Sequence, residues 1–212
     1  VLDNLPEPLR SQLRFGDFAA TQTDDPWQVI PTDWVRAAQA RWGERPRPTT
    51  PLSAAGVDPA RGGPDKFTIA KRYDNWLAPI VRHPGAAAPD GQAGAKLIVA
   101  EVGSAQAPAN MDVGGQAGSS TYDHYKILGT AVALNGSEAS KARDKSGKLG
   151  FVNKRAEWIW RFREALDPSS GQDIALPPDP ELLSDLCAAR WKPTARGIQI
   201  EKNDEIKKRI GR

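Results

Sequence analysis

Two aspartates each follow a short apolar run that is typical of a β-strand. Asp58 ends the run over residues 53–58, and Asp112 ends the run ANMD at 109–112. If the two strands lie side by side in a sheet, both carboxylates meet in the crevice where open α/β sheets bind ligands. Close carboxylates repel each other unless a proton or a cation separates them, and hard divalent cations prefer carboxylate oxygens. The pair indicates metal-dependent phosphoryl chemistry, whereas either aspartate alone is more typical of a cap or turn.

The segment after Asp58 predicts a hairpin that returns the chain along the first strand. It contains Gly62 and Gly63, which permit a tight return of the chain or a close approach of the backbone to DNA. The runs 66–73 and 75–82 then follow with almost no spacer, so we expect them to pair antiparallel.

A second group of strands is expected further along the chain. Residues 109–134 show the pattern of strand, glycine-rich turn, helix and strand, which is a βαβ unit with parallel strands. Residues 96–102 form a short apolar run that periodicity alone cannot assign to helix or strand. The polar segment 137–150 predicts a mobile loop.

Helices are predicted on the N-terminal side of these strands. Residues 31–42 have an apolar face at helical spacing, and Thr32 or Asp33 can cap the helix. A short helix is also predicted over 6–18, and the proline-rich segment 43–52 is typical of a linker.

The C-terminal third predicts two more helices and a last strand. The helix over 151–166 has an apolar face made of Trp158, Ile159, Phe162, Ala165 and Leu166. A further helix is expected over 177–191, with prolines and Asp179 at its start. Residues 197–212 begin as a strand and end as a basic segment with helical propensity. This order of elements predicts a mixed α/β sheet flanked by helices in one domain.

Composition restricts the class of protein. The chain has 212 residues, of which 39% are hydrophobic and 26% charged, so a packed core is expected. A net charge of +3 is a mild indication of a nucleic-acid partner. The single cysteine, Cys187, excludes an internal disulfide framework and a multi-cysteine zinc site. No apolar run is long enough to span a bilayer, and no export signal is recognisable, so we expect a cytoplasmic protein without a membrane partner.

Several common active sites are not supported. The Gly147–Lys148 pair is followed by leucine, and alanine stands at position 142, so the phosphate-binding loop of nucleotide triphosphatases is missing. VGGQAG at 113–118 lacks the first glycine of the dinucleotide fingerprint and is better explained as a tight turn from strand to helix. His124 is expected on a helix surface, and neither histidine accompanies a serine or cysteine nucleophile motif.

Five segments in order carry a resemblance to a known family, and together they cover almost the whole chain. They are GDFAATQTDDPWQVIPTDWVRAAQARW, GVDPARGGPDKFTIAKR, MDVGGQAGSSTYDHY, NKRAEWIWRFREAL and GIQIEKNDEIKKRIGR. The chain resembles the C-terminal nuclease domain of the large terminase subunits of tailed bacteriophages. The resemblance implies a ribonuclease-H-like mixed β-sheet flanked by helices, and it favours a helix over 96–102. It also implies that residues 1–50 are a leader from the ATPase side and that residues 51–212 are the nuclease domain.

The resemblance also assigns site residues. Asp58 matches the family's first-strand metal ligand and Asp112 its second acid, which implies two Mg²⁺ or Mn²⁺ ions and a DNA endonuclease. Asp65 matches a frequent auxiliary acid, although a hairpin-turn role is the favoured alternative. The family's third acid follows the basic run near the C-terminus, so it is expected beyond Arg212, and the 212-residue form is then weakly active or inactive.

The implied partners are double-stranded DNA, the packaging ATPase domain of the same full-length chain, the small terminase subunit and the portal. The implied location is the host bacterial cytoplasm. Basic residues around the acids are candidates for phosphate binding, with solvated surface as the alternative for each. They are Arg61, Lys66, Lys71, Arg72, Lys141, Arg143, Lys145 and Lys148.

Two other classes of protein stay open. One is another ribonuclease-H-like DNA enzyme, such as a transposase or a junction resolvase. The other is a DNA-binding or motor-docking module whose acids are structural. Metal titration separates the second class from both kinds of enzyme.

Overall fold

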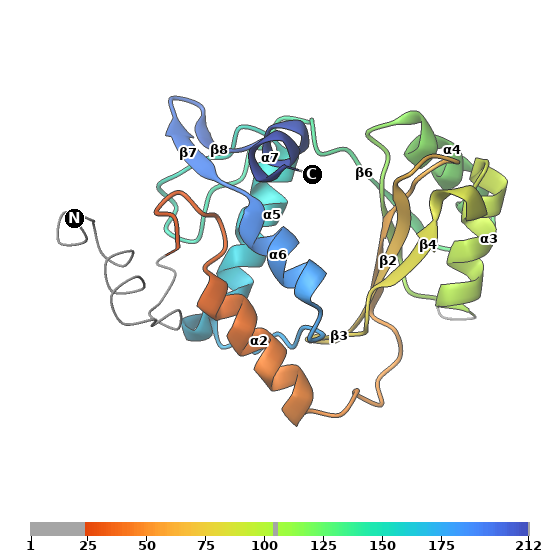
Figure 1. Cartoon of the computed structure of the whole chain (residues 1–212), viewed down its shortest axis with the longest axis horizontal. Coiled ribbons are helices and arrows are strands. Elements are labelled where there is room, and N and C mark those ends of the chain that lie inside the picture. The colour runs from red at the N-terminus through yellow and green to blue at the C-terminus, as the bar shows by residue number, and fades with distance from the viewer. Residues whose placement is uncertain (1–23, 104–105, 212) are drawn as a thin grey trace, which may run out of the picture.

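The computed structural model describes residues 24–103 and 106–211. Within them, a six-stranded sheet and a group of helices with a small hairpin face each other (Figure 1). We call residues 54–134 the sheet lobe, and residues 24–44 together with 151–211 the helical lobe. No helix in the described ranges is both long and apolar enough to cross a membrane.

The sheet is mixed, as the sequence predicts. Its strand order is β3-β2-β1-β5-β6, with β4 also paired to β2. The pairs that β2 makes with β1, β3 and β4 are antiparallel, whereas β1–β5 and β5–β6 are parallel. The strands are β1 Ala54–Asp58, β2 Lys66–Tyr73, β3 Trp76–Leu77, β4 Val81–Pro84, β5 Ala109–Asp112 and β6 Ala131–Leu134. The predicted βαβ unit is therefore confirmed.

The strand predicted over 75–82 is divided into β3 and β4. Both pieces pair with β2, so the antiparallel arrangement is confirmed. Pro79 lies in the interruption, and proline cannot donate a ladder hydrogen bond, which explains the break.

Alternation along β1 separates the core from the site. Ala55 and Val57 are buried, while Gly56 and Asp58 lie on the opposite, exposed face. The buried face packs against α3 Gly91–Val102 and α4 Gln116–Tyr125. The run 96–102 belongs to α3 and is therefore a helix rather than a strand. This core consists of Ala55, Val57, Phe67, Ile69, Ala88, Ala95, Ile98, Val102, Ala109, Met111 and Tyr125.

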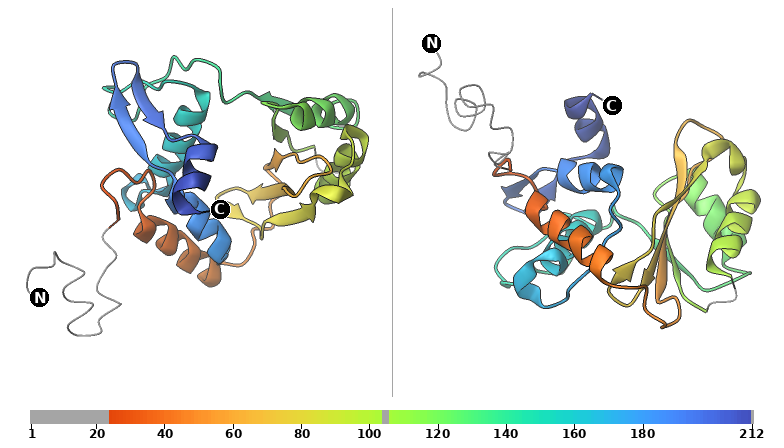
Figure 2. Two further views of the ribbon diagram at one scale, coloured as in Figure 1. Left: turned by 45° about the horizontal axis from the view of Figure 1, so that its top comes forward. Right: turned by 60° about the horizontal axis from the view of Figure 1, so that its bottom comes forward.

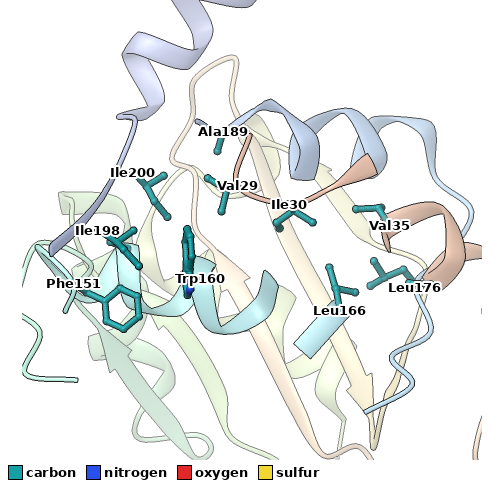
Figure 3. Close-up of a cluster of buried hydrophobic side chains, with 12 residues drawn as sticks. Val29, Ile30, Val35, Phe151, Trp160, Leu166, Leu176, Ala189, Ile198 and Ile200 are labelled. Carbon is teal, nitrogen blue, oxygen red and sulfur yellow. The ribbon is translucent and has the colours of Figure 1, made fainter. Parts of the chain in front are cut away.

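The helical lobe has its own core, built from segments far apart in the chain. Figure 3 shows Val29, Ile30 and Val35 packed with side chains from the C-terminal third, including Trp160 and Ile198. The helices and strands of this lobe are α2 Thr32–Glu44, α5 Lys154–Leu166, α6 Pro180–Ala188, β7 Trp191–Thr194, β8 Gly197–Ile200 and α7 Asn203–Ile210. Short 3-10 turns occupy Gly85–Ala87 and Pro168–Ser170.

Two details of the helices differ from expectation. The helix predicted from residue 151 begins at Lys154, because Asn153 caps it by accepting a hydrogen bond from the Ala156 amide at 2.9 Å. The cap of α2 comes from outside the helix: Asp24 accepts hydrogen bonds from the amide and hydroxyl of Thr32, at 2.7 and 2.5 Å.

The two lobes join at one end of the sheet, as the two views of Figure 2 show. There Trp42 of α2 stacks on Trp76 of β3 with ring centroids 5.2 Å apart. The Leu77 amide donates to the Ala175 carbonyl at 2.9 Å, and Tyr73 is buried beside them. The division at residue 50 stays a prediction, and the short helix predicted over 6–18 lies outside the described residues.

Candidate functional site

The structure brings Asp58 and Asp112 together at the C-terminal ends of adjacent parallel strands. Val57 is the register partner of Met111, so the two aspartates that follow them occupy equivalent positions. Both line a cleft of about 380 Å³ between the exposed sheet face and α5. Its other lining residues are Gly56, Val57, Thr68, Ala70, Asn110, Leu134, Gly136, Arg155 and Trp158.

Electrostatics in the cleft favour a cation or a proton at Asp58. Its side chain is open to solvent on one side, yet partial removal from water raises the pKa of Asp58 above its ordinary value. The carboxylates of Asp112 and Asp65 raise this pKa further, while Lys207 lowers it. A divalent ion bound here would relieve the same repulsion.

Asp112 is held by the turn that follows it. Its Oδ1 atom accepts a hydrogen bond from the Gly114 amide at 2.8 Å. A side chain at Gly118 would collide with the Asp112 carbonyl, so this glycine lets α4 pack closely on the end of β5. The VGGQAG segment therefore serves as the tight turn expected from the sequence, and it fixes the second acid.

Asp65 lies on the rim, close enough to Asp58 to affect its charge. It is exposed, and its Oδ1 atom is 3.9 Å from the Nζ atom of Lys207 on α7. Lys207 is a site residue that sequence reasoning missed, although the basic run at 207–209 was visible. Nothing in that run indicated that it would lie across the cleft from the acids.

A third acid is not assigned by the structure. Across residues 24–103 and 106–211, no group of three or more histidine, cysteine, aspartate or glutamate side chains is arranged to hold a metal ion. The Glu201 carboxylate accepts hydrogen bonds from Arg209 at 3.0 and 2.7 Å. Asp204 lines a separate hollow with Asn153 rather than the cleft of the acid pair.

The predicted phosphate-binding cations occupy different places. Arg61 and Lys66 line a larger cleft of about 1080 Å³, which also contains Asp58 and Asp65 and extends to α6 and α7. Within it, the Nζ atom of Lys66 is 3.3 Å from Glu181. The structure thus brings these two cations to the cleft that contains Asp58 and Asp65.

Two other predicted cations are not brought to the acids. Lys71 shares the face of β2 that carries the buried Ile69 and is paired with Glu101 of α3 at 2.6 Å. Arg72 is the register partner of Ala54, at the opposite end of β1 from Asp58. Strand alternation and register, respectively, account for these positions.

The loop cations lie between β6 and α5 and line neither cleft. They are Lys141, Arg143, Lys145 and Lys148. The guanidinium of Arg143 hydrogen-bonds to the Gly147 and Lys148 carbonyls within the same loop. His124, as expected, is exposed on α4.

Trp158 and Arg155 are further residues of the site that the sequence did not reveal. Trp158 was expected in the apolar face of its helix, but it lines the acid cleft, and Trp160 is the aromatic side chain that the core buries. The later start of the helix does not explain this difference. Packing of the helix against Val35 and Ile198 sets which of its faces is buried. Arg155 is half-buried beside Asp112, and removal from water lowers the pKa of its guanidinium while Asp112 raises it.

No protein-family model matches the chain, and no curated protein matches it in sequence. Solved structures do match it. The nuclease domain of the large terminase subunit gp2 of bacterial virus Sf6 superposes with a TM-score of 0.64 at 19% sequence identity, covering 87% of this chain and 92% of that one.

Two ligand-bound structures of a lysine-to-alanine mutant of the same viral protein also match this chain. One holds manganese and beta-thujaplicinol (TM-score 0.63) and the other calcium (TM-score 0.62), each at 19% identity and with the same coverage of both chains. The acid pair thus lies in a mixed sheet flanked by helices, and this chain has the fold of the nuclease domain of the large terminase subunit gp2 of bacterial virus Sf6.

Proposed function

We propose that the chain is the nuclease domain of a phage DNA-packaging terminase, a metal-dependent endonuclease that cuts concatemeric double-stranded DNA. The observation that carries the proposal is the acid pair, in which Asp58 and Asp112 end adjacent parallel strands on one exposed face. The manganese and calcium bound to the Sf6 domain support a divalent cation as the cofactor.

The residues present fit such a cation. Two solvent-open carboxylates, Asp58 and Asp112, would hold Mg²⁺ or Mn²⁺ between them, and Asp65 on the rim is an auxiliary acid. A pair of such ions held there would supply activation of a water molecule and stabilisation of the leaving oxygen of a phosphodiester. Arg61 and Lys66 lie in the adjoining cleft, where they would bind the phosphates of the DNA backbone.

Two-metal hydrolysis normally requires a third carboxylate. We propose, from the resemblance to the terminase nuclease domains, that this acid follows Arg212 in the full-length protein. The packaging ATPase domain, the small terminase subunit and the portal are the proposed partners, and the host bacterial cytoplasm is the proposed location.

Calorimetric titration with Mn²⁺ tests the metal site directly. The wild-type chain should bind Mn²⁺, whereas Asp58→Asn and Asp112→Asn should each lose most of this affinity because each removes one charged ligand. Asp123→Asn, an exposed acid of α4, is the matched control and should bind like wild type. Equal binding by wild type and Asp58→Asn would contradict the proposal and favour a non-catalytic DNA-binding module.

Nicking of supercoiled plasmid, with and without EDTA, tests the activity. We expect slow or no cutting by the 212-residue form, and non-specific Mn²⁺- or Mg²⁺-dependent cutting by a form extended through the following segment. Asp112→Ala in the extended form should abolish cutting and leave DNA binding intact. Full activity of the 212-residue form would show that a residue such as Asp65 supplies the third ligand. A preference for branched or transposon-end DNA would favour a resolvase or a transposase.

A further inference from the structure

Helix α7 reaches the acid pair from the helical lobe, and polar contacts rather than burial hold it in place. Its Lys207 lies 3.9 Å from Asp65 and influences Asp58. None of the eight residues of α7 is buried, and Ile206 is its one side chain packed, in part, against the helical core. Burial therefore contributes little to the position of this helix.

Arg155 ties the start of α7 to the rigid part of the helical lobe. Its guanidinium donates from Nη1 to the Glu201 carbonyl at 2.9 Å and from Nη2 to Asn203 Oδ1 at 2.7 Å. Its own backbone is fixed, because its amide donates to the Gly136 carbonyl at 2.9 Å and the next residue, Ala156, is buried. A planar guanidinium can satisfy two such acceptors at once, which an ammonium group cannot do in the same geometry.

The other polar contacts of α7 do not replace this tie. The Lys207–Asp65 pair is exposed on both sides, and exposed pairs of this kind contribute little. Arg209 bonds to Glu201, just before the helix, and to the Ala188 carbonyl at the end of α6. These contacts fix the C-terminal end of α7. At the N-terminal end, the Lys202 amide donates to Glu205 within the helix and the Glu201 amide donates to the Arg190 carbonyl before it. Arg155 is the side chain that joins Asn203 to α5.

We propose that Arg155 is a positioning residue that holds the N-terminus of α7 and thereby keeps Lys207 beside Asp58 and Asp65. The metal-binding role of the acids rests on the proposed function. The link between Arg155 and α7 rests on the hydrogen bonds of the guanidinium. Lys207 places a positive charge near the acids that would bind a divalent cation, and its like charge disfavours that cation. Release of α7 should therefore strengthen Mn²⁺ binding to the acid pair.

Hydrogen exchange of the backbone amides in the 212-residue chain tests the tie. Arg155→Met should lower protection across α7 by about ten-fold, the loss expected for hydrogen bonds to a charged group, and leave α6 unchanged. Arg155→Lys should give an intermediate loss. Arg161→Met is the control, because Arg161 lies on the same helix but pairs with Glu157. If Arg155→Met does not fold, Asn203→Ala, which removes one acceptor, takes its place.

Calorimetry with Mn²⁺ tests the consequence for the site. Arg155→Met, Asn203→Ala and Lys207→Gln should each bind Mn²⁺ about two- to five-fold more tightly, the range for loss of one exposed charge interaction. Asn203→Ala distinguishes an effect through the position of α7 from an effect of the Arg155 charge on Asp112, because it leaves that charge in place.

Unchanged protection of α7 in Arg155→Met would overturn the proposal. Tighter Mn²⁺ binding in Arg155→Met but not in Asn203→Ala would also overturn it, since Arg155 would then act through its own charge on Asp112. If the wild-type chain binds no Mn²⁺ at all, the proposed function fails. The exchange experiment still decides whether Arg155 holds α7.

Discussion

The sheet lobe and the helical lobe are assembled from the chain in opposite ways. The sheet lobe comes from one continuous segment, and both acids lie on its strands. The helical lobe unites residues near 29–38 with residues near 151–200 in one core. It contributes Arg155 and Lys207 to the site. The acids thus meet through the pairing of β1 with β5 inside one continuous segment, whereas the charges around them depend on the docking of the two lobes.

Removal of a core side chain from the sheet lobe should lower the stability of the protein more than any other change considered below. Phe67 is fully buried, so Phe67→Ala should lower the free energy of unfolding by about 3–5 kcal/mol. Because Trp76 and Ala175 join the lobes, we expect one transition for both. Urea denaturation followed by tryptophan fluorescence, which reports mainly the helical lobe, should coincide with far-UV circular dichroism. Two separate transitions would show that the lobes unfold independently.

The ion pairs across the lobes should have a smaller effect. Arg82 of β4 contacts Asp179 at 2.7 Å and Glu181 at 3.3 Å, at the start of α6. These side chains are partly shielded from water, so Arg82→Gln should cost about 1–2 kcal/mol of stability. Arg45, which follows α2, makes a more exposed pair with Asp173 that does not cross the lobes, and Arg45→Gln should cost less than about 1 kcal/mol. Equal losses in urea denaturation would mean that the Arg82 contacts do not fasten the lobes.

The acid pair should make the sheet lobe slightly less stable at neutral pH. The fold raises the pKa of Asp58 above 3.8, so folding disfavours its ionised form, and stability is lost as pH rises through this region. Without metal, Asp58→Asn should therefore be more stable than wild type at pH 7, by less than about 1 kcal/mol because the site is open to solvent. The difference should vanish below the ordinary pKa. A less stable variant at pH 7 would contradict the assigned electrostatics.

The smallest expected effect concerns DNA binding. It should separate basic residues that line the cleft of Asp58 and Asp65 from those that do not. Arg61 lies in the cleft with the acids, whereas Arg72 lies at the far end of β2. Arg61→Gln should weaken DNA binding about two- to five-fold and reduce the slope of its salt dependence by about one. Arg72→Gln should bind like wild type. Fluorescence anisotropy at several salt concentrations measures both, and equal weakening would place the DNA outside the cleft.

Much of the sheet lobe could be predicted from local patterns. Apolar runs ending in Asp58 and Asp112, with a glycine-rich turn before a helix, indicated the strands, the parallel unit and the acid pair. The strands and the turns are set within a few residues by alternation, turn chemistry and hydrophobic burial, and the acids meet because β1 then pairs with β5. The division of the strand over 75–82 differs from the prediction because Pro79 interrupts the ladder between β3 and β4.

The sequence by itself determined the two acids, the strands that carry them and the mixed α/β class. Only the tertiary structure decided which charges surround the acids. Strand register carried Arg72 away from the crevice, and packing of the helical core turned Trp158 toward it. Docking of the lobes brought Lys207 to Asp65. The physical reason is that local patterns specify which face of an element is buried, whereas contacts between distant segments depend on how those buried faces pack together.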